Sequence, residues 1–320
     1  MVNPYETSGN GITSPDQFIG RRETLARILE QVVRGESIQI VGPLKIGRTS
    51  LLRMIAHPSV GGIHGLDPDR FTVILMDLHE LAGRAGAHEF YRWMLSALCD
   101  ALPEASSSVS TATPFSQLCQ ALRRLDRIGR RVVFACDNFE FIERLASDPD
   151  LLSTLRALAS RHASLVVTTL TPLDVLLRPY SNPQTSPLWN VLRRHDLGVY
   201  SPEEAELMIR CPQSVWSPES SGTPGRDVLA LEWVSRIQGY VGTHPYLLQL
   251  ACAEVYELQR LEENRFEERH RSLVEDWLEH LSQDARLLLT ALRETPPPEW
   301  GPILEPQYPR RLLVEGGWLS

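Results

Sequence analysis

The chain has 320 residues, which is long enough for two domains or three small ones. Its residues are 42% hydrophobic and 22% charged, as in an ordinary soluble globular protein with a sizeable core. The net charge of −8 excludes a global basic field that would hold nucleic acid, although it leaves room for a local basic patch.

The cysteines and the N-terminus indicate a cytoplasmic protein. The five cysteines are scattered without a CxxC pair, which is typical of reduced thiols in the cytosol and makes a zinc site unexpected. The N-terminal residues are polar and turn-rich, so we expect no signal peptide. Because no apolar run approaches the ~18 residues of a membrane span, we expect no membrane segment.

Up to about residue 200, strand patterns alternate with helix patterns. Short apolar runs predict strands at 38–41, 71–78, 132–137, 165–169 and 196–200. Helical periodicity predicts helices from residue 18, from residue 48, and at 88–102, 115–128 and 149–161, with loops at 56–70, 103–114 and 171–187. This alternation predicts an α/β fold with a parallel sheet, whose ligands sit at the carboxyl ends of its strands. Gly42, Asp137 and Thr168 all fall at such ends.

The stretch 37–55 carries the most informative motif. A buried strand leads to Gly42 and Gly47, and then Arg48, Thr49 and Ser50 open an apolar helical pattern. Strand, glycine loop and helix form the context of a P-loop, in which backbone N–H groups and the helix N-terminus hold an anion. The hydroxyl of Thr49 would bind Mg²⁺. A glycine turn between an ordinary strand and helix is the alternative.

Arg48 departs from the P-loop pattern, which has lysine at this position. Arginine keeps the positive charge, but a planar fork replaces the compact ammonium group, so the reach to the β- and γ-oxygens changes. Lys45, inside the loop, adds charge nearby. We therefore expect a loop that still contacts phosphates, through altered contacts.

After residue 200 the pattern becomes helical. Ser201, Pro202, Glu203 and Glu204 form a helix start, with an N-cap, a proline and acids in the first turn. Further helices are predicted at about 228–238, 245–262 and 270–293, with a Ser/Pro/Gly loop at 213–227.

Four segments resemble, in the right order, the sequence boxes of the STAND branch of the AAA-related P-loop ATPases. They are FIGRRETLARIL at 18–29, GPLKIGRTSLL at 42–52, VVFACDNFE at 132–140 and GYVGTHPYLLQL at 239–250. The resemblance implies a P-loop NTPase core at 1–200, a helical lid at 201–268 and a truncated winged-helix-like segment at 269–320.

The resemblance also implies a site for ATP or ADP with Mg²⁺. Phe18, Ile19 and Gly20 would flank the base, and Pro245, with His244 near it, would close over the base or the phosphates from the lid. Thr49 and Asp137 would hold the metal, and Arg48 and Asp137 would be the catalytic residues. The expected nucleotide-binding residues are Phe18, Ile19, Gly20, Gly42, Pro43, Lys45, Ile46, Gly47, Arg48, Thr49, Ser50, His244 and Pro245.

A second departure concerns hydrolysis. The family pattern has glutamate after the strand-terminal acid, whereas here Asn138 follows Asp137. Asparagine can orient a water molecule but cannot take its proton. Glu140 lies two residues further on, and its ability to substitute depends on the geometry of the turn. Without the usual lysine and glutamate, we expect hydrolysis to be slower by several orders of magnitude.

The sequence therefore predicts a nucleotide-binding switch or scaffold with weak or absent hydrolysis. We expect it to act in signalling or defence through another protein, an effector or sensor on a separate chain, or through a second copy of itself. One alternative is a DNA-associated ATPase-like factor, although the acidity of the chain argues against a nucleic-acid partner. The other is a pseudo-ATPase with an empty pocket that serves as a protein-interaction module.

Several side chains have two explanations. Thr168 and Thr169 are either a phosphate sensor or plain β-branched strand ends. His244 is either a ligand group or a packed histidine. The arginines at 123–131 are either a solvated helix end or a partner or phosphate site. Arg193 and Arg194 are candidates for a trans-acting finger.

Overall fold

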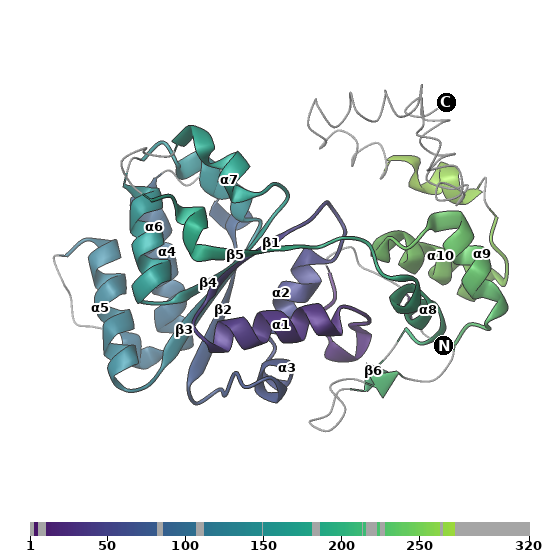
Figure 1. Cartoon of the computed structure of the whole chain (residues 1–320), viewed down its shortest axis with the longest axis horizontal. Helices are drawn as coiled ribbons and strands as arrows, with labels where there is room; N and C mark the ends of the chain where they lie inside the picture. The colour runs from purple at the N-terminus through teal and green to yellow at the C-terminus, as the bar shows by residue number, and fades with distance from the viewer. Residues whose placement is uncertain are drawn as a thin grey trace.

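The computed structural model describes residues 3–5, 11–81, 86–106, 112–148, 150–180, 186–212, 214–215, 223–224, 228–262 and 265–272. Figure 1 shows a sheet-containing part, with helices on both of its faces, and a group of helices beside it. The predicted α/β class is confirmed.

Five parallel strands form the central sheet, in the order β2-β3-β4-β1-β5. Four of them lie within one residue of their predicted bounds. The strands are β1 (Ser37–Val41), β2 (Phe71–Asp77), β3 (Arg131–Asp137), β4 (Ser164–Thr169) and β5 (Leu192–Asp196). The strand predicted at 196–200 is wrong, because β5 precedes it. As an edge strand, β5 exposes charged Arg193 and Arg194, so it lacks the apolar run that marks a buried strand.

Alternate residues of β3 show how the two faces of the sheet are filled. Val132, Phe134 and Cys136 belong to the core beneath α4 (Ala87–Ala101), α5 (Pro114–Arg127) and α6 (Leu151–Arg161). Val133 and Ala135 belong to the core beneath α1 (Arg22–Val33) and α2 (Arg48–Ala56). A strand buried on both faces needs apolar residues at every position, which is the continuous pattern that predicted it.

Two stretches predicted as loops contain short helices, α3 (Pro58–Ile63) and α7 (Leu173–Leu176). α3 includes Gly61 and Gly62, which have low helix propensity, so the sequence gives little sign of it. Tertiary packing stabilises this helix instead, since Val60 is fully buried in the core.

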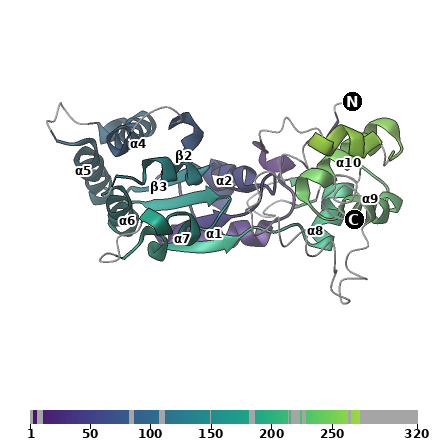
Figure 2. The same cartoon turned by 90° about the horizontal axis from the view of Figure 1, so that it is seen from above.

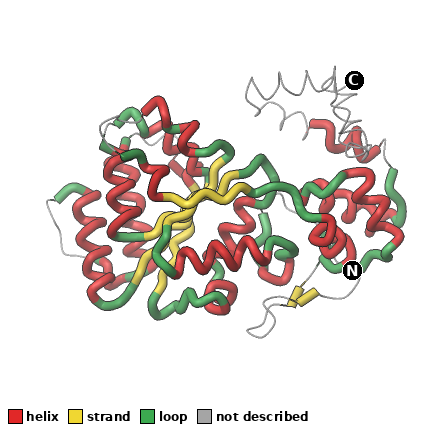
Figure 3. Tube along the Cα trace, in the orientation of Figure 1, coloured by secondary structure: helices red, strands yellow, loops and turns green. Residues whose placement is uncertain are grey.

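The remaining described residues form a helical lobe at the end of the molecule opposite α4 and α5 (Figures 2 and 3). α8 (Pro202–Arg210) begins as predicted, with a capping box between Ser201 and Glu204. α9 (Glu232–Val241) and α10 (Pro245–Leu258) correspond to the helices predicted at 228–238 and 245–262. Within the predicted loop 213–227, β6 (Ser214–Val215) and β7 (Thr223–Pro224) form a short antiparallel pair.

The described part of the chain ends in helical residues at 265–272. The rest of the helix predicted at 270–293, and nearly all of the predicted winged-helix-like segment at 269–320, lie outside the described residues. The domain boundaries at 200 and 268 stay a prediction. Among the described residues, no helix combines the length and the apolar character that crossing a bilayer requires.

Candidate functional site

The glycine loop joins β1 to α2 and is closely packed against the core. Gly47 caps α2 with a φ of +101°, a left-handed conformation that favours glycine, and nothing lies within 4 Å of where a Cβ would be. At Gly42 a Cβ would lie 2.9 Å from both the Ile46 side chain and the Leu197 carbonyl oxygen. Ile46 is buried and anchors the loop, whereas Pro43 and Lys45 are exposed. The loop therefore presents its backbone and the start of α2.

The N-terminal segment lies against the beginning of α2. The Ile12 N–H donates to Ser50 Oγ at 3.0 Å, and Arg53 Nη1 donates to the Gly11 carbonyl oxygen at 3.0 Å. Thr49 lies next to Gly11, and its side chain is only partly buried. The hydroxyl of Ser50 thus holds the segment in place, and the metal-ligand role of Thr49 stays a prediction.

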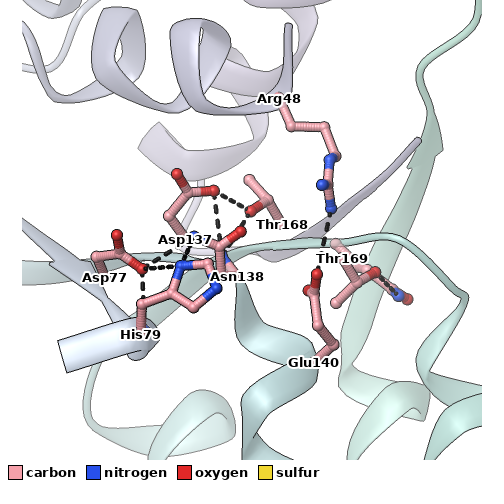
Figure 4. Close-up of polar contacts among 9 residues, drawn as sticks. Arg48, Asp77, His79, Asp137, Asn138, Glu140, Thr168 and Thr169 are labelled. Carbon is pink, nitrogen blue, oxygen red and sulfur yellow. Dashed lines mark hydrogen bonds and ion pairs between the residues drawn. The ribbon is translucent and has the colours of Figure 1, made fainter. Parts of the chain in front are cut away.

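Arg48 crosses from α2 to the carboxyl end of β3 (Figure 4). Its Nη1 lies 3.7 Å from Glu140 Oε1, and its side chain is only 8% exposed. Burial lowers the pKa of Arg48, and the charges of Glu140 and Asp137 oppose that shift. Burial raises the pKa of Glu140, and Arg48 opposes that shift. The turn after β3 therefore does bring Glu140 into the site, as the partner of Arg48.

Asp137 is held by hydrogen bonds at the end of β3. Its carboxylate accepts from the hydroxyl of Thr168 and, at 3.1 Å, from the Asn138 N–H. The backbone of Asn138 is left-handed, with a φ of +52°. Its side chain donates to Asp77 Oδ1 at 2.9 Å and lies 3.0 Å from His79 Nδ1 (Figure 4). Asn138 is thus engaged by β2 and by the turn that follows it.

Thr168 and Thr169 were both candidates for a phosphate sensor. Thr168 contacts Asp137 in the structure, and Thr169 Oγ1 accepts from Gln39 Nε2 at 2.9 Å. Both threonines are completely buried. The sensor role stays a prediction, and the geometry makes Thr168 a residue that positions Asp137.

The helical lobe contacts the glycine loop directly. His244, at the N-cap of α10, forms a hydrogen bond with the backbone of Leu44, and Lys45 Nζ lies 5.3 Å from the centroid of the Tyr246 ring. Burial lowers the pKa of His244 to about 4, against the opposing effect of that hydrogen bond. Pro245 is buried as the first residue of α10. His244 and Pro245 therefore lie beside the glycine loop.

Arg21 is a site residue that the sequence analysis missed. Its Nη2 donates to the carbonyl oxygens of Ile46 at 3.0 Å and Gly198 at 2.5 Å, and its backbone N–H donates to the Glu204 carboxylate. Its guanidinium also lies 4.9 Å from the centroid of the Tyr200 ring. Arg21 thereby joins the glycine loop to the helical lobe. Apolar periodicity does not reveal a buried arginine. The sequence feature that could have pointed to Arg21 is its place in the segment FIGRR.

The predicted base-flanking residues lie where the two parts of the molecule meet. Phe18 belongs to the core beneath α1 and α2, whereas Ile19 belongs to the core of the helical lobe. Gly20 lies beside the ring of Tyr200. Their contact with a base stays a prediction.

These groups fit a nucleotide with Mg²⁺. The loop offers backbone N–H groups and an open approach at Gly47, and Arg48 Nη1 is buried without a hydrogen-bond partner in the described part of the chain. Thr49 and Asp137 carry oxygen atoms of the kind that Mg²⁺ prefers as ligands, and their role as its ligands stays a prediction.

Comparison with known proteins bears on the fold that carries these groups. Residues 33–174 match the AAA domain family, and the curated proteins gave no match. The structure is similar to the Walker-type ATPase of Pyrococcus abyssi, with a TM-score of 0.59 and 17% identity over 91% of this chain and 82% of that chain.

Two other solved structures share the fold. The ORC2 protein of Aeropyrum pernix, in ADPNP–ADP complexes, has a TM-score of 0.54 and 16% identity over 91% of this chain and 77% of its own. The Cdc6p of Pyrobaculum aerophilum has a TM-score of 0.52 and 12% identity over 90% and 78%. The matched domain and these likenesses show that the chain has the P-loop NTPase fold of AAA-type ATPases.

Proposed function

We propose that this protein is a STAND-like switch or scaffold that binds ATP or ADP with Mg²⁺ and hydrolyses ATP slowly or not at all. The observation that carries the proposal is the contact between the helical lobe and the glycine loop, made by His244 with Leu44 and by Tyr246 with Lys45. A nucleotide held by that loop would lie at the junction of the two parts. The helical lobe would then act as its lid.

The binding machinery comes from the ends of β1, β3 and α2. The loop 42–47 and the first turn of α2 would hold the phosphates, and Thr49 and Asp137 would hold Mg²⁺. When bound, Mg²⁺ neutralises charge on the phosphate oxygens. The hydrogen bonds from Thr168 and Asn138 hold the Asp137 carboxylate in one orientation for this role.

Slow hydrolysis follows from the two substituted positions. A water molecule that attacks a phosphate needs a group to orient it and accept its proton. The amide of Asn138 cannot accept that proton and is bonded to Asp77, while Glu140 is paired with Arg48. The site therefore favours retention of the nucleotide over its turnover.

A switch needs two states that the nucleotide distinguishes. Contacts between the lid and the loop would make the position of the lid depend on the nucleotide. Phosphates in the loop would alter the surroundings of Leu44 and Lys45, and hence of their partners His244 and Tyr246. We expect the lid to pass this change to another protein or to a second copy of the chain, in the cytoplasm, in signalling or defence.

The test combines binding and turnover. ATP and ADP with Mg²⁺ should each raise the melting temperature of the purified chain. Radiolabelled ATP should be hydrolysed at well under one turnover per second, below the usual range for enzymes. If neither nucleotide shifts the melting temperature, the pseudo-ATPase with an empty pocket replaces the proposal, and ordinary multiple-turnover hydrolysis contradicts its second half.

A DNA-associated role remains the other alternative. For that role DNA would need a basic surface, and the arginines at 123–131 offer a reduced one. Arg124 donates to the Ala105 carbonyl oxygen at 2.8 Å, and Arg130 lies 3.8 Å from Glu104, so neither side chain is fully available to a phosphate. A gel shift with duplex DNA that weakens steeply with salt would favour the DNA-associated factor.

A further inference from the structure

We propose that Glu140 is an internal counter-ion of Arg48 that competes with the terminal phosphate of a bound nucleoside triphosphate. Glu140 would thereby set the affinity for ATP relative to ADP. This inference rests on the proposed nucleotide site and deepens it, because it assigns a specificity-determining role to a residue outside the glycine loop.

The geometry of the pair is that of a loosely held ion pair. Arg48 Nη1 and Glu140 Oε1 lie 3.7 Å apart, and both side chains are largely buried. Arg48 Nη1 and Glu140 Oε2 have no hydrogen-bond partner among the described residues. A buried ion pair that leaves some of its polar atoms without hydrogen bonds recovers only part of the free energy that its charges lose on leaving water. Arg48 can therefore gain by exchanging Glu140 for a partner that accepts its hydrogen bonds.

The turn that carries Glu140 is fixed by its neighbours. Asn138 turns the chain through a left-handed conformation, and Phe139 and Ile142 are buried in the core on either side of Glu140. These anchors hold the 3₁₀ helix Phe139–Leu145 against the sheet. The fold therefore fixes Glu140 opposite Arg48, and their contact does not depend on a freely moving surface side chain.

A phosphate is the better partner for Arg48, but taking it has a consequence for Glu140. A guanidinium can donate two parallel hydrogen bonds to phosphate oxygens. Once Arg48 turns to the phosphate, the Glu140 carboxylate is left largely buried, with Asp137 as a like charge nearby. Leaving one member of a buried pair without its partner is strongly unfavourable. Glu140 therefore lowers the affinity for any ligand that takes Arg48 from it.

Glu140 should lower the affinity for ATP and leave the affinity for ADP largely unchanged. The residue at this position of a P-loop reaches the β- and γ-phosphates. The guanidinium of Arg48 points toward Glu140, near the carboxyl end of β3 (Figure 4), and the charge of Asp137 also acts on it. ADP has no γ-phosphate to draw Arg48 away from Glu140, so the ion pair can persist when ADP binds.

The experiment is a calorimetric titration of a non-hydrolysable ATP analogue and of ADP, each with Mg²⁺. Glu140→Gln removes the charge and keeps the shape of the side chain. It should raise the ratio of the ADP Kd to the analogue Kd by roughly tenfold, the order expected for coupling between contacting groups. Glu143→Gln is the matched control, because Glu143 lies in the same 3₁₀ helix and contacts Tyr180 instead. It should leave the ratio unchanged.

A double-mutant cycle shows whether the effect acts through Arg48. In an Arg48→Met background, Glu140→Gln should no longer change the ratio. If the glutamine variant does not fold, Glu140→Asp withdraws the carboxylate by one methylene and should move the ratio in the same direction by less. An unchanged or lowered ratio in Glu140→Gln, or the same effect without Arg48, overturns the inference.

The outcomes also separate this inference from the proposed function. If the parent chain binds both ligands and Glu140→Gln leaves their ratio unchanged, the inference falls and the nucleotide site stands. If the parent binds neither ligand and Glu140→Gln binds the analogue, the inference is supported and the parent is not a nucleotide switch. If neither protein binds either ligand, both fall.

Discussion

Thr168 and Thr169 are neighbouring threonines whose hydroxyl groups contact different partners. Successive residues of a strand point to opposite faces. The Thr168 hydroxyl donates to Asp137, the proposed metal ligand, and the Thr169 hydroxyl accepts from the amide of Gln39. Because both threonines are completely buried, removing either hydroxyl should leave its buried polar partner without a hydrogen bond.

The two threonines therefore provide a matched pair of variants. Thr168→Val and Thr169→Val should each lower the free energy of unfolding by about 1–3 kcal/mol, measured by urea denaturation. Only Thr168→Val should also weaken the Mg²⁺ dependence of nucleotide binding, because only Thr168 orients Asp137. Equal weakening in Thr169→Val would contradict this division of roles.

His244 should make the stability of the protein depend on pH. Its pKa is lowered to about 4 in the folded chain, so the folded state binds fewer protons than the unfolded state, whose histidine titrates near 6.5. Its contribution is complete above about pH 6.5 and is lost as the pH falls toward 4, by up to ~3 kcal/mol. In urea denaturation between pH 7 and 5, His244→Asn should reduce this loss, and an identical loss in the variant would refute the assignment.

At this scale, sequence patterns predicted the residues of the loop and the acid at the end of β3, because each belongs to a local motif. They left open whether Glu140 reaches the site. The pairing of Arg48 with Glu140 depends on the left-handed backbone of Asn138 and on the packing of the turn, neither of which a local pattern encodes. Arg21 was missed for the same reason, because its partners are backbone carbonyl groups far away in the chain.

At the scale of elements, the strands buried on both faces were predictable and the edge was not. β5 reads LRRHD, and its exposed arginines conceal a strand that is defined by its pairing with β1. α3 was hidden by its glycines. In both cases tertiary contacts override local propensity.

Gly42 tests how tightly the loop between β1 and α2 is packed, and Gly62, an exposed glycine in α3, serves as its control. Gly42→Ala should lower the free energy of unfolding by about 1–3 kcal/mol, because the new methyl group would meet Ile46 and the Leu197 carbonyl. Gly62→Ala, at an exposed helical position with open space around it, should raise the free energy of unfolding by up to ~1 kcal/mol. Thermal or urea denaturation distinguishes the signs, and a stabilising Gly42→Ala would contradict the packing described.

The N-terminal segment should contribute strongly to the helical lobe. Tyr5 is 1% exposed, and its hydroxyl donates to the Ile209 carbonyl oxygen at the end of α8. Tyr5→Ala should lower the free energy of unfolding by about 3–5 kcal/mol through the cavity it leaves. Tyr5→Phe should lower it by only about 1 kcal/mol through the lost hydrogen bond. Equal effects in urea denaturation would show that the ring does not pack as described.

At the scale of the whole molecule, the segment between β5 and α8 links the glycine loop to the helical lobe. The Leu197 N–H donates to the Val41 carbonyl oxygen at 2.7 Å, Gly198 accepts from Arg21, and the Tyr200 N–H donates to the Thr243 carbonyl oxygen at 3.0 Å. This chain of contacts runs from the end of β1 to the residue before His244. We therefore expect a change at the loop to reach the helical lobe through these hydrogen bonds and the short chain segment that joins them.

The most direct test of a nucleotide site between core and lid is hydrogen–deuterium exchange of the parent chain with and without ATP and Mg²⁺. The account predicts slower exchange in two peptides, one covering residues 41–50 of the glycine loop and the other covering residues 239–250 of the lid. The account is contradicted if saturating ATP leaves both peptides unchanged, or if it protects a surface that includes neither of them.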